Sequence, residues 1–448
     1  MRDVYLADGS AAVVVSAGSP EQLAADAAGW AAYLDTHPDV TPAAVAALAF
    51  RAKVIEPHRA IVRGRSATQL GEAMRAIAAG GVHPDAARIA GPALPRRIAF
   101  VFPGQGSQQA GMGRDFYDRS ADYRDAADEI NAEFEATVEI SPLDYLLDDT
   151  HAEDVRILQP AIFLHTLALA RMWQAVGIQP AAVIGHSQGE IAAVVVSGHL
   201  GLRDGIRIVA DRARVVYRSA YEDGHDTCAM AVVGADRATV EAKLARLTGW
   251  AELAVVNSAT VHAISGDERA IDTMVAAFAA DGVFARRIGV DHPGHTSFVR
   301  LYEKEFNGTH AEIEATGFAA GDIPCFGGTL GAEITSDLPV GDYWFWNLRN
   351  RVRFDLAITA AADAGINTFV EMSEHPTMLL SITETLGIAG VSAVVVGTGK
   401  KKSDPLDAFA ANHSQVLVGD AGFAGPAVIA PAGAVLPDFL RDRARAVR

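Results

Sequence analysis

Cysteine is scarce in this sequence, with only Cys228 and Cys325 among 448 residues. Two cysteines cannot build a disulfide framework, and their spacing matches no zinc site. The sequence therefore predicts a protein without structural disulfides or a metal site. A reducing cytoplasm is its expected location.

Long uncharged apolar runs are also absent, although 50% of the residues are hydrophobic. None reaches the roughly 18–20 residues that a membrane span needs, and the start of the chain has no signal-peptide pattern. Basic residues are in the minority, with 38 Lys and Arg against 55 Asp and Glu and a net charge of −17. We therefore expect no membrane and no nucleic-acid partner, although a local arginine can still hold a small anion.

The hydrophobic pattern predicts an α/β protein of two or three domains. Residues 1–95 read as a small α/β unit, with Ser19 and Ser66 as helix N-caps. An apolar strand at 98–102 begins a larger unit. The segment 228–288 has the order strand, helix, strand, strand, helix, strand, which is typical of a ferredoxin-like unit inserted into the larger one.

A G-x-S-x-G pattern places Ser187 between Gly185 and Gly189. An apolar run at 181–184 precedes it, and a helix-forming segment at 190–196 follows. Strand, tight turn and helix are the context of a nucleophile elbow, in which small flanking residues let strand and helix pack closely. The free N–H groups of the helix N-terminus then favour negative charge near the serine oxygen.

A glycine-rich loop at 103–108 follows the strand at 98–102. Such a loop brings backbone and short polar groups close to a ligand. A phosphate-binding loop is the obvious alternative, but the lysine that its pattern requires is missing. The loop is therefore a candidate wall of a site and not a nucleotide-binding motif.

Two further features could carry chemistry. His292 and His295 are separated by Pro293 and Gly294, which bend the backbone, and this cluster is a reasonable place for a general base. Arg212 lies in a helix that begins near residue 202, and its spacing alone favours a solvated helix face.

These motifs together resemble the acyltransferase domains of modular type I polyketide synthases, and they are similar to those of malonyl-CoA:acyl-carrier-protein transacylases. The resemblance covers about residues 96–400. It rests on five features in the same order and at the same spacing: the loop at 102–108, the elbow at 185–190, Arg212, Asn257 with Ser265-Gly266, and the histidine motif that ends at His295.

The resemblance implies a role for each of the main residues. Ser187 is the expected nucleophile, and His295 is the expected base that activates it and later the incoming thiol. Gln105, together with the backbone N–H of Gln188, is expected to form an oxyanion hole. Arg212 is expected to pair with the free carboxylate of a malonyl-type group.

The resemblance and the elbow geometry imply supporting roles for two further residues, Asn347 and His186. Asn347 occupies the position from which the family orients its histidine by an oxygen atom. His186 precedes the serine but is expected to support the site by packing or hydrogen bonding, because adjacent residues at an elbow point apart.

The acyl preference stays open on sequence grounds. Methylmalonyl-selective relatives have Tyr-Ala-Ser-His and malonyl-selective ones His-Ala-Phe-His where this chain has residues 292–295. His292 favours malonyl, whereas Gln188 and the segment 155–159 favour methylmalonyl. Pro293 and Gly294 depart from both patterns, and Gly294 leaves room for a larger acyl group.

The resemblance also implies a domain layout and partners. Residues 1–95 resemble a ketosynthase–acyltransferase linker, and 401–448 resemble a post-acyltransferase linker. The larger subdomain, at 96–222 and 289–400, is expected to be α/β-hydrolase-like with a parallel sheet, and 223–288 is the small ferredoxin-like subdomain. A coenzyme A thioester is the expected substrate, with no tightly bound cofactor. Expected partners are an acyl carrier protein bearing phosphopantetheine and a ketosynthase, in the same chain or a separate one.

Two other classes of function share some of these features. A serine hydrolase or thioesterase of the α/β-hydrolase type has the same elbow but needs an acid between serine and histidine in the sequence. Asp291 is the nearest carboxylate and a poor candidate, since it is only four residues from His295. A non-catalytic docking module of a megasynthase is the third hypothesis.

Overall fold

The computed structural model describes residues 5–51, 55–106, 108–109, 111–148, 154–221, 227–304, 306, 317–423 and 437. The chain divides into two compact units. One comprises residues 1–96, 176–178 and 402–448, and the other comprises 97–175 and 179–401. Both units mix helices with sheets, as the sequence predicts for an α/β protein.

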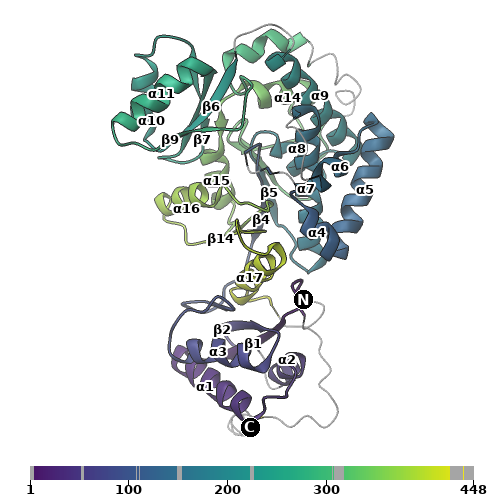
Figure 1. Cartoon of the computed structure of the whole chain (residues 1–448), viewed down its shortest axis with the longest axis vertical. Coiled ribbons are helices and arrows are strands. Elements are labelled where there is room, and N and C mark those ends of the chain that lie inside the picture. Colours follow the sequence, from purple (N-terminus) through teal and green to yellow (C-terminus); the bar gives the residue numbers. More distant parts are fainter. Residues whose placement is uncertain are drawn as a thin grey trace. The chain divides into compact units, whose positions relative to one another are not determined.

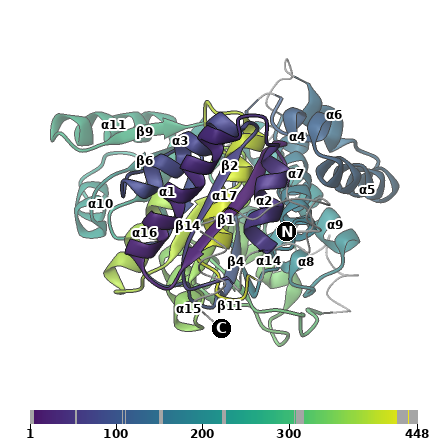
Figure 2. The same cartoon turned by 90° about the horizontal axis from the view of Figure 1, so that it is seen from below.

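The first unit is built on an antiparallel sheet in the order β1-β2-β3: β1 (Ala11–Ala17), β2 (His58–Gly64) and β3 (Ala86–Arg88). The described helices of this unit are α1 (Pro20–Thr36), α2 (Pro42–Arg51), α3 (Ala67–Ala78) and α17 (Pro405–Val418). Helices α1 and α3 pack together beside β1 and β2 (Figure 2). The predicted caps are confirmed, because the Ser19 and Ser66 hydroxyls accept from the N–H groups of Gln22 and Gln69.

Helix α17 is a finding that the sequence pattern did not predict. It packs against β2 and β3 within the first unit. The Leu94 N–H donates to the Gly419 carbonyl oxygen, and the Ala421 N–H donates to Leu94. The Asp404 side chain caps the helix by accepting from the N–H of Asp407. These contacts join segments more than 300 residues apart, which local periodicity cannot indicate.

The second unit contains a six-stranded sheet in the order β11-β10-β5-β4-β13-β14. Five of its strands are parallel and only β11 is antiparallel. The strands are β4 (Ile98–Phe102), β5 (Ala182–Gly185), β10 (Cys325–Gly327), β11 (Ala332–Glu333), β13 (Thr368–Glu371) and β14 (Val394–Gly397). Phe102 pairs with Gly185 at the carboxyl ends of β4 and β5, so the glycine-rich loop and the elbow leave the sheet side by side.

Helices cover this sheet on two sides, with α7 and α8 on one and α15 and α16 on the other (Figure 1). Outside the segment 228–288, the described helical segments of this unit are α4 (Arg114–Arg119), α5 (Ala121–Val138), α6 (Pro142–Leu147), α7 (Val155–Ala175), α8 (Gly189–Val196), α9 (Leu202–Tyr221), the 3₁₀ segment η1 (Ser297–Tyr302), α14 (Val340–Arg349), α15 (Phe354–Asp363) and α16 (Leu379–Ile388). Helix α7 starts at Val155, directly after Asp154. Asp154 caps it by accepting from the Arg156 N–H, which offsets the helical bond lost at Pro160.

A second, five-stranded sheet has the order β12-β7-β8-β6-β9. Its elements follow the predicted sequence order: β6 (Cys228–Val233), α10 (Arg237–Leu244), β7 (Ala251–Val256), β8 (His262–Asp267), α11 (Glu268–Ala280) and β9 (Ala285–Ile288). Strand β12 (Val352–Arg353), which was not predicted, pairs in parallel with β7.

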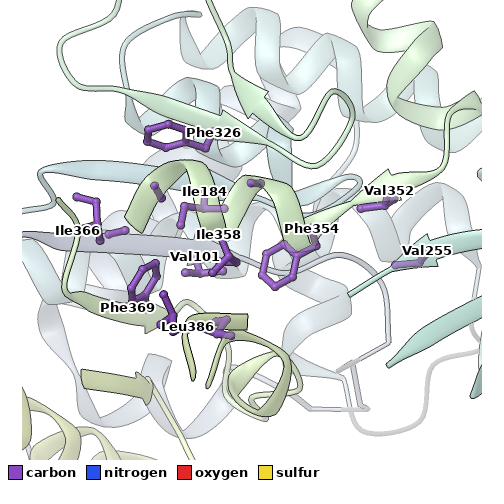
Figure 3. Packing of buried hydrophobic residues seen from close by; sticks show 14 of the residues in the cluster. Val101, Ile184, Val255, Phe326, Val352, Phe354, Ile358, Ile366, Phe369 and Leu386 are labelled. Carbon is purple, nitrogen blue, oxygen red and sulfur yellow. The ribbon is translucent and has the colours of Figure 1, made fainter. Parts of the chain in front are cut away.

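The core of the second unit joins both sheets. Figure 3 shows Val101 and Ile184 of the six-stranded sheet near Phe354 and Ile358 of α15, and the same cluster includes Val255 of the five-stranded sheet. Burial of these side chains holds the two sheets at fixed positions and therefore defines the space between them. Among the described helices, none is both long and apolar enough to cross a bilayer.

Candidate active site

Ser187 sits in a strained turn between β5 and α8, with φ of 55°. The glycines on either side are required by close packing. A Cβ added at Gly185 would lie 2.3 Å from the Glu190 Cα, and one added at Gly189 would lie 2.2 Å from the Phe102 carbonyl oxygen. This geometry is that of the predicted nucleophile elbow.

His295 lies next to Ser187, with its Nε2 atom 2.7 Å from the serine Oγ. It also has a positive φ, 62°, and its own N–H donates to the Leu348 carbonyl oxygen. Burial holds the pKa of His295 well below 6.5, and the positive charge of Arg212 is the second largest cause. The imidazole is therefore neutral at pH 7 and able to accept a proton.

His295 is oriented by a hydrogen bond that its ring donates to the Asn350 backbone carbonyl, and not by Asn347. The Nδ1 atom of His295 lies 2.9 Å from the Asn350 carbonyl oxygen. The predicted role of Asn347 is therefore corrected. Its amide nitrogen donates to the Ser187 carbonyl oxygen at 2.9 Å and to the Thr329 hydroxyl at 3.0 Å. A backbone carbonyl can hold any histidine, so the side chain at 350 gave no signal in the sequence.

Arg212 is buried on α9, 2% exposed, and not on a solvated helix face. Its Nη2 donates to the Ser187 Oγ at 3.1 Å, while Nη1 and Nε make 3.4 Å contacts with the side-chain oxygens of Gln159 and Asn347. Burial lowers the pKa of Arg212 to about 10, opposed by the negative charge of Glu190. The guanidinium is therefore still a cation at pH 7.

These contacts also fix the direction of the proton on Ser187. Arg212 can only donate, so the serine hydroxyl accepts from it and directs its own hydrogen to His295. Nε2 is then the accepting nitrogen of His295, and Nδ1–H donates to the Asn350 carbonyl. The arrangement is that of a serine poised to lose its proton to a neutral histidine.

Arg212 makes no salt bridge with any carboxylate among the described residues. Its guanidinium carries five N–H groups, and two of the three polar contacts that they make are long, at 3.4 Å. A buried guanidinium that has no carboxylate partner among the described residues offers a strong bidentate site for a carboxylate that enters the pocket.

The two glutamines predicted for an oxyanion hole lie at the same pocket. The Gln188 N–H, at the start of α8, donates to no acceptor among the described residues. The Gln105 side-chain oxygen accepts from the Gln159 amide at 3.3 Å. Gln159 thus contacts both Gln105 and Arg212, a link that the sequence analysis missed. Ser107 of the glycine-rich loop lies outside the described residues.

Of the residues predicted for selectivity, His292 lines the pocket, whereas Pro293 and Gly294 are not part of its lining. The space that Gly294 leaves open is taken by His292, because an added Cβ would lie 2.8 Å from the His292 Cε1. The Gly294 N–H donates to the His292 Nδ1 at 3.2 Å. Burial lowers the pKa of His292 to about 4, and the positive charge of Arg212 is the second largest cause.

His186 supports the site through contacts with Asn257 and Phe354. Its Nε2 lies 2.8 Å from the Asn257 side-chain oxygen, and its ring packs edge-on against Phe354. No hydrogen bond joins His186 to Ser187 among the described contacts, so the structure brings the serine to His295 instead.

The pocket lies between the two sheets of the second unit and has an empty volume of about 900 Å³, part of it open to solvent. Its polar end holds Ser187, His295 and Arg212. Its opposite wall is apolar and is contributed largely by the five-stranded sheet: Met230, Val232, Val255, Ala263 and Ile288. The described residues contain no cluster of His, Cys, Asp or Glu able to hold a metal, and both cysteines are buried.

Comparison with known proteins agrees with this geometry. Residues 99–422 match the family model described as the acyl transferase domain. The chain is 34% identical over 442 residues to a spectinabilin polyketide synthase system protein of Streptomyces orinoci, covering 96% of this chain and 12% of that protein. It is 36% identical over 382 residues to a pikromycin polyketide synthase component of Streptomyces venezuelae, covering 83% and 23%. It thus spans less than a quarter of the length of these relatives.

Solved structures give the same result. The acyltransferase domain from module 8 of the salinomycin polyketide synthase aligns with a TM-score of 0.80 and 32% identity, covering 93% of this chain and 96% of that one. A loading acyltransferase from the avermectin modular polyketide synthase aligns with a TM-score of 0.65 and 31% identity, covering 71% and 99%. The resemblance inferred from the sequence is confirmed, and the chain belongs to the acyl transferase domain family of modular polyketide synthases.

Proposed function

We propose that this chain takes a malonyl-type acyl group, malonyl or methylmalonyl, from coenzyme A onto Ser187 and passes it to the phosphopantetheine thiol of an acyl carrier protein. The observation that carries the proposal is the meeting of three groups in one pocket. A serine, a neutral histidine 2.7 Å away and a buried arginine without a carboxylate partner among the described residues lie together there.

The first half-reaction acylates the serine. The Ser187 hydroxyl gives its proton to the His295 Nε2 as Oγ attacks the thioester carbonyl. The carbonyl oxygen becomes negative, and the Gln188 N–H, with a donor from the loop that holds Gln105, stabilises it. Collapse of this intermediate breaks the C–S bond, and the proton on His295 leaves with the coenzyme A thiol.

The second half-reaction runs the same steps in the opposite sense. His295 takes the proton from the carrier-protein thiol, and the thiolate attacks the Ser187 ester. The serine oxygen then leaves and regains the proton. Apart from the reacting serine hydroxyl and thiol, only His295 changes its protonation state, and the Asn350 carbonyl keeps the imidazole oriented throughout.

Arg212 supplies the preference for a carboxylated acyl group. The free carboxylate replaces the contact of Nη2 with Ser187 and pairs with the guanidinium, which leaves the serine oxygen free to attack. His292 lies at the same end of the pocket and limits the size of the group on the α-carbon. A single methyl is worth about 1–3 kcal/mol in such a pocket.

The proposal includes the domain layout implied by the resemblance. Residues 1–95 and 401–448 act as linkers before and after the acyltransferase, and 223–288 form a small ferredoxin-like subdomain within the α/β-hydrolase-like part at 96–222 and 289–400. The chain works in the cytoplasm with a carrier protein and a ketosynthase, which is in the same polypeptide or a separate one. Coenzyme A thioesters are substrates, and no tightly bound cofactor takes part.

The two alternatives have less support. A hydrolase triad needs a carboxylate on the histidine, yet the Asp291 carboxylate accepts from Tyr221, and the Nδ1 atom of His295 faces a backbone carbonyl. A docking module without catalysis has no need for a strained serine at φ 55° beside a neutral histidine.

The experiment is a competition. The protein is incubated with equal amounts of malonyl-, methylmalonyl-, acetyl- and propionyl-CoA, and the mass added to the chain is read before and after a carrier protein is supplied. We expect a carboxylated adduct that moves to the carrier. Equal labelling by the uncharged donors, or release of the free acid without transfer, would favour a hydrolase.

A further inference from the structure

Glu190 is a fully buried carboxylate directly behind the catalytic turn, with 0% of its surface exposed. It lies on the first turn of α8, three residues after Ser187. The chain around it is shaped to admit it, since a Cβ added at Gly327 would lie 2.6 Å from the Glu190 Oε2. Glu190 does not line the pocket, so it does not contact the acyl group itself.

Every described partner of this carboxylate is a hydrogen-bond donor. The Thr329 N–H donates to Oε1 at 2.7 Å, the Thr329 hydroxyl donates at 2.9 Å, and the Tyr343 hydroxyl donates to Oε2 at 2.5 Å. Burial raises the pKa of Glu190 to about 7, and hydrogen bonding from Tyr343, Thr329 and Asn347 opposes the rise. The Thr329 N–H can only donate and both hydroxyls are able to donate, so these surroundings suit a carboxylate, which only accepts.

This carboxylate sets the direction of the next hydrogen bonds. The Thr329 hydroxyl donates its single hydrogen to Glu190. Towards Asn347, 3.0 Å away, it can therefore only act as an acceptor. The Ser187 carbonyl oxygen also only accepts, at 2.9 Å from the same amide nitrogen. Both hydrogens of the Asn347 amide are therefore committed, and its oxygen must face the Arg212 Nε at 3.4 Å.

We infer that Asn347 is a positioning residue that holds the Arg212 guanidinium for the acyl carboxylate, and that Glu190 fixes the orientation of Asn347 through the Thr329 hydroxyl. This inference rests on the proposed function. It assigns a role to Asn347 that differs from histidine orientation, and it gives roles to two residues, Glu190 and Thr329, that lie outside the pocket. The amide of Asn347 links the backbone of Ser187 to the carboxylate-binding arginine.

The test removes one hydroxyl from this chain of contacts. Thr329→Val keeps the size of the side chain and the N–H bond to Glu190 but removes the acceptor for Asn347. Thr329→Ser is the matched control, because it keeps the hydroxyl and loses only a methyl group. Rates of Ser187 acylation are measured with malonyl-CoA and with acetyl-CoA, which differ only in the carboxylate.

We expect Thr329→Val to lower kcat/KM for malonyl-CoA by about tenfold, mostly through a higher KM, with little change for acetyl-CoA. Thr329→Ser should restore the ratio of the two donors. A role in folding alone would lower both rates equally and leave their ratio unchanged, and that result would overturn the inference.

A second variant keeps the inference testable if Thr329→Val does not fold. Asn347→Asp has the same shape but puts a negative oxygen beside Arg212, which then pairs internally. The malonyl-to-acetyl ratio should fall at least as far as in Thr329→Val, and an unchanged ratio would contradict the inference. If the unaltered protein acylates Ser187 with neither donor, the proposed function itself fails, which is a distinct outcome.

Discussion

The Ser187 Oγ and the His295 Nε2 lie 2.7 Å apart although the two residues are 108 positions apart in the chain. Both have positive φ angles, 55° and 62°. Such backbone conformations are costly for residues other than glycine and persist where the surrounding fold imposes them. The two strained residues come from distant parts of the chain and bring nucleophile and base together, with a backbone carbonyl instead of a carboxylate behind the histidine.

Arg212 should decide whether the acyl group must carry a carboxylate. We expect Arg212→Ala to lower kcat/KM for malonyl-CoA by about 100-fold and to affect acetyl-CoA much less, since only the former pairs with the guanidinium. Arg212→Lys keeps the charge but loses the bidentate geometry, so an intermediate loss is expected. Stopped-flow or quenched acylation assays with both donors measure the ratio, and an equal loss for both would contradict this role.

The acid limb of the pH profile should lie well below pH 6.5. The pKa of His295 is lowered by burial and by Arg212, so the imidazole stays neutral as pH falls through 6.5 and gains a proton only below that. Acylation should therefore be constant between pH 6.5 and neutrality. In Arg212→Ala, assayed with acetyl-CoA, one cause of the low pKa is gone and the limb should move to higher pH. A limb that begins above pH 6.5 in the unaltered protein would be inconsistent with a buried neutral base.

Gly189 should tolerate no side chain. An alanine there would bring its Cβ within 2.2 Å of a backbone oxygen, which cannot move without distorting β4. We expect Gly189→Ala to cost more than about 3 kcal/mol of unfolding free energy, measured by urea denaturation. Gly387→Ala is the matched control, because this glycine lies in α16 with no atom within 4 Å of an added Cβ. It should be neutral or stabilising by up to about 1 kcal/mol.

His292 and Gly294 should be coupled. An alanine at 294 would press on the His292 ring, so Gly294→Ala is expected to destabilise the protein by about 1–3 kcal/mol. In the double variant with His292→Ala the clash disappears, and the cost should be less than the sum of the two single changes. Additive costs in a denaturation cycle would mean that the ring does not occupy this space.

The sequence was sufficient to predict the elements whose signals are local. The caps at Ser19 and Ser66 and the apolar strand at 98–102 could be read directly, and the order of motifs led to the family. Contacts made by backbone atoms could not be predicted. For that reason the hydrogen bond that orients His295 was assigned to Asn347, whereas the backbone carbonyl of Asn350 makes it. Only the family resemblance placed Arg212 in the site, since its position in the helical pattern predicted a solvent-exposed side chain.

Two other features depended on tertiary contacts. Helix α17 is held by partners near residue 94, so its own pattern gave little reason to predict it. Gly294 was interpreted as leaving space for a larger acyl group, but the neighbouring imidazole of His292 fills that space. In each case the decisive neighbour could not be identified from local spacing.

The most direct measurement is the intact mass of the protein after incubation with malonyl-CoA, with the modified peptide identified by fragmentation. We predict one malonyl ester on Ser187, none in Ser187→Ala, and strongly slowed formation in His295→Ala. A malonyl adduct that persists in Ser187→Ala would contradict the central claim that Ser187 carries the acyl group.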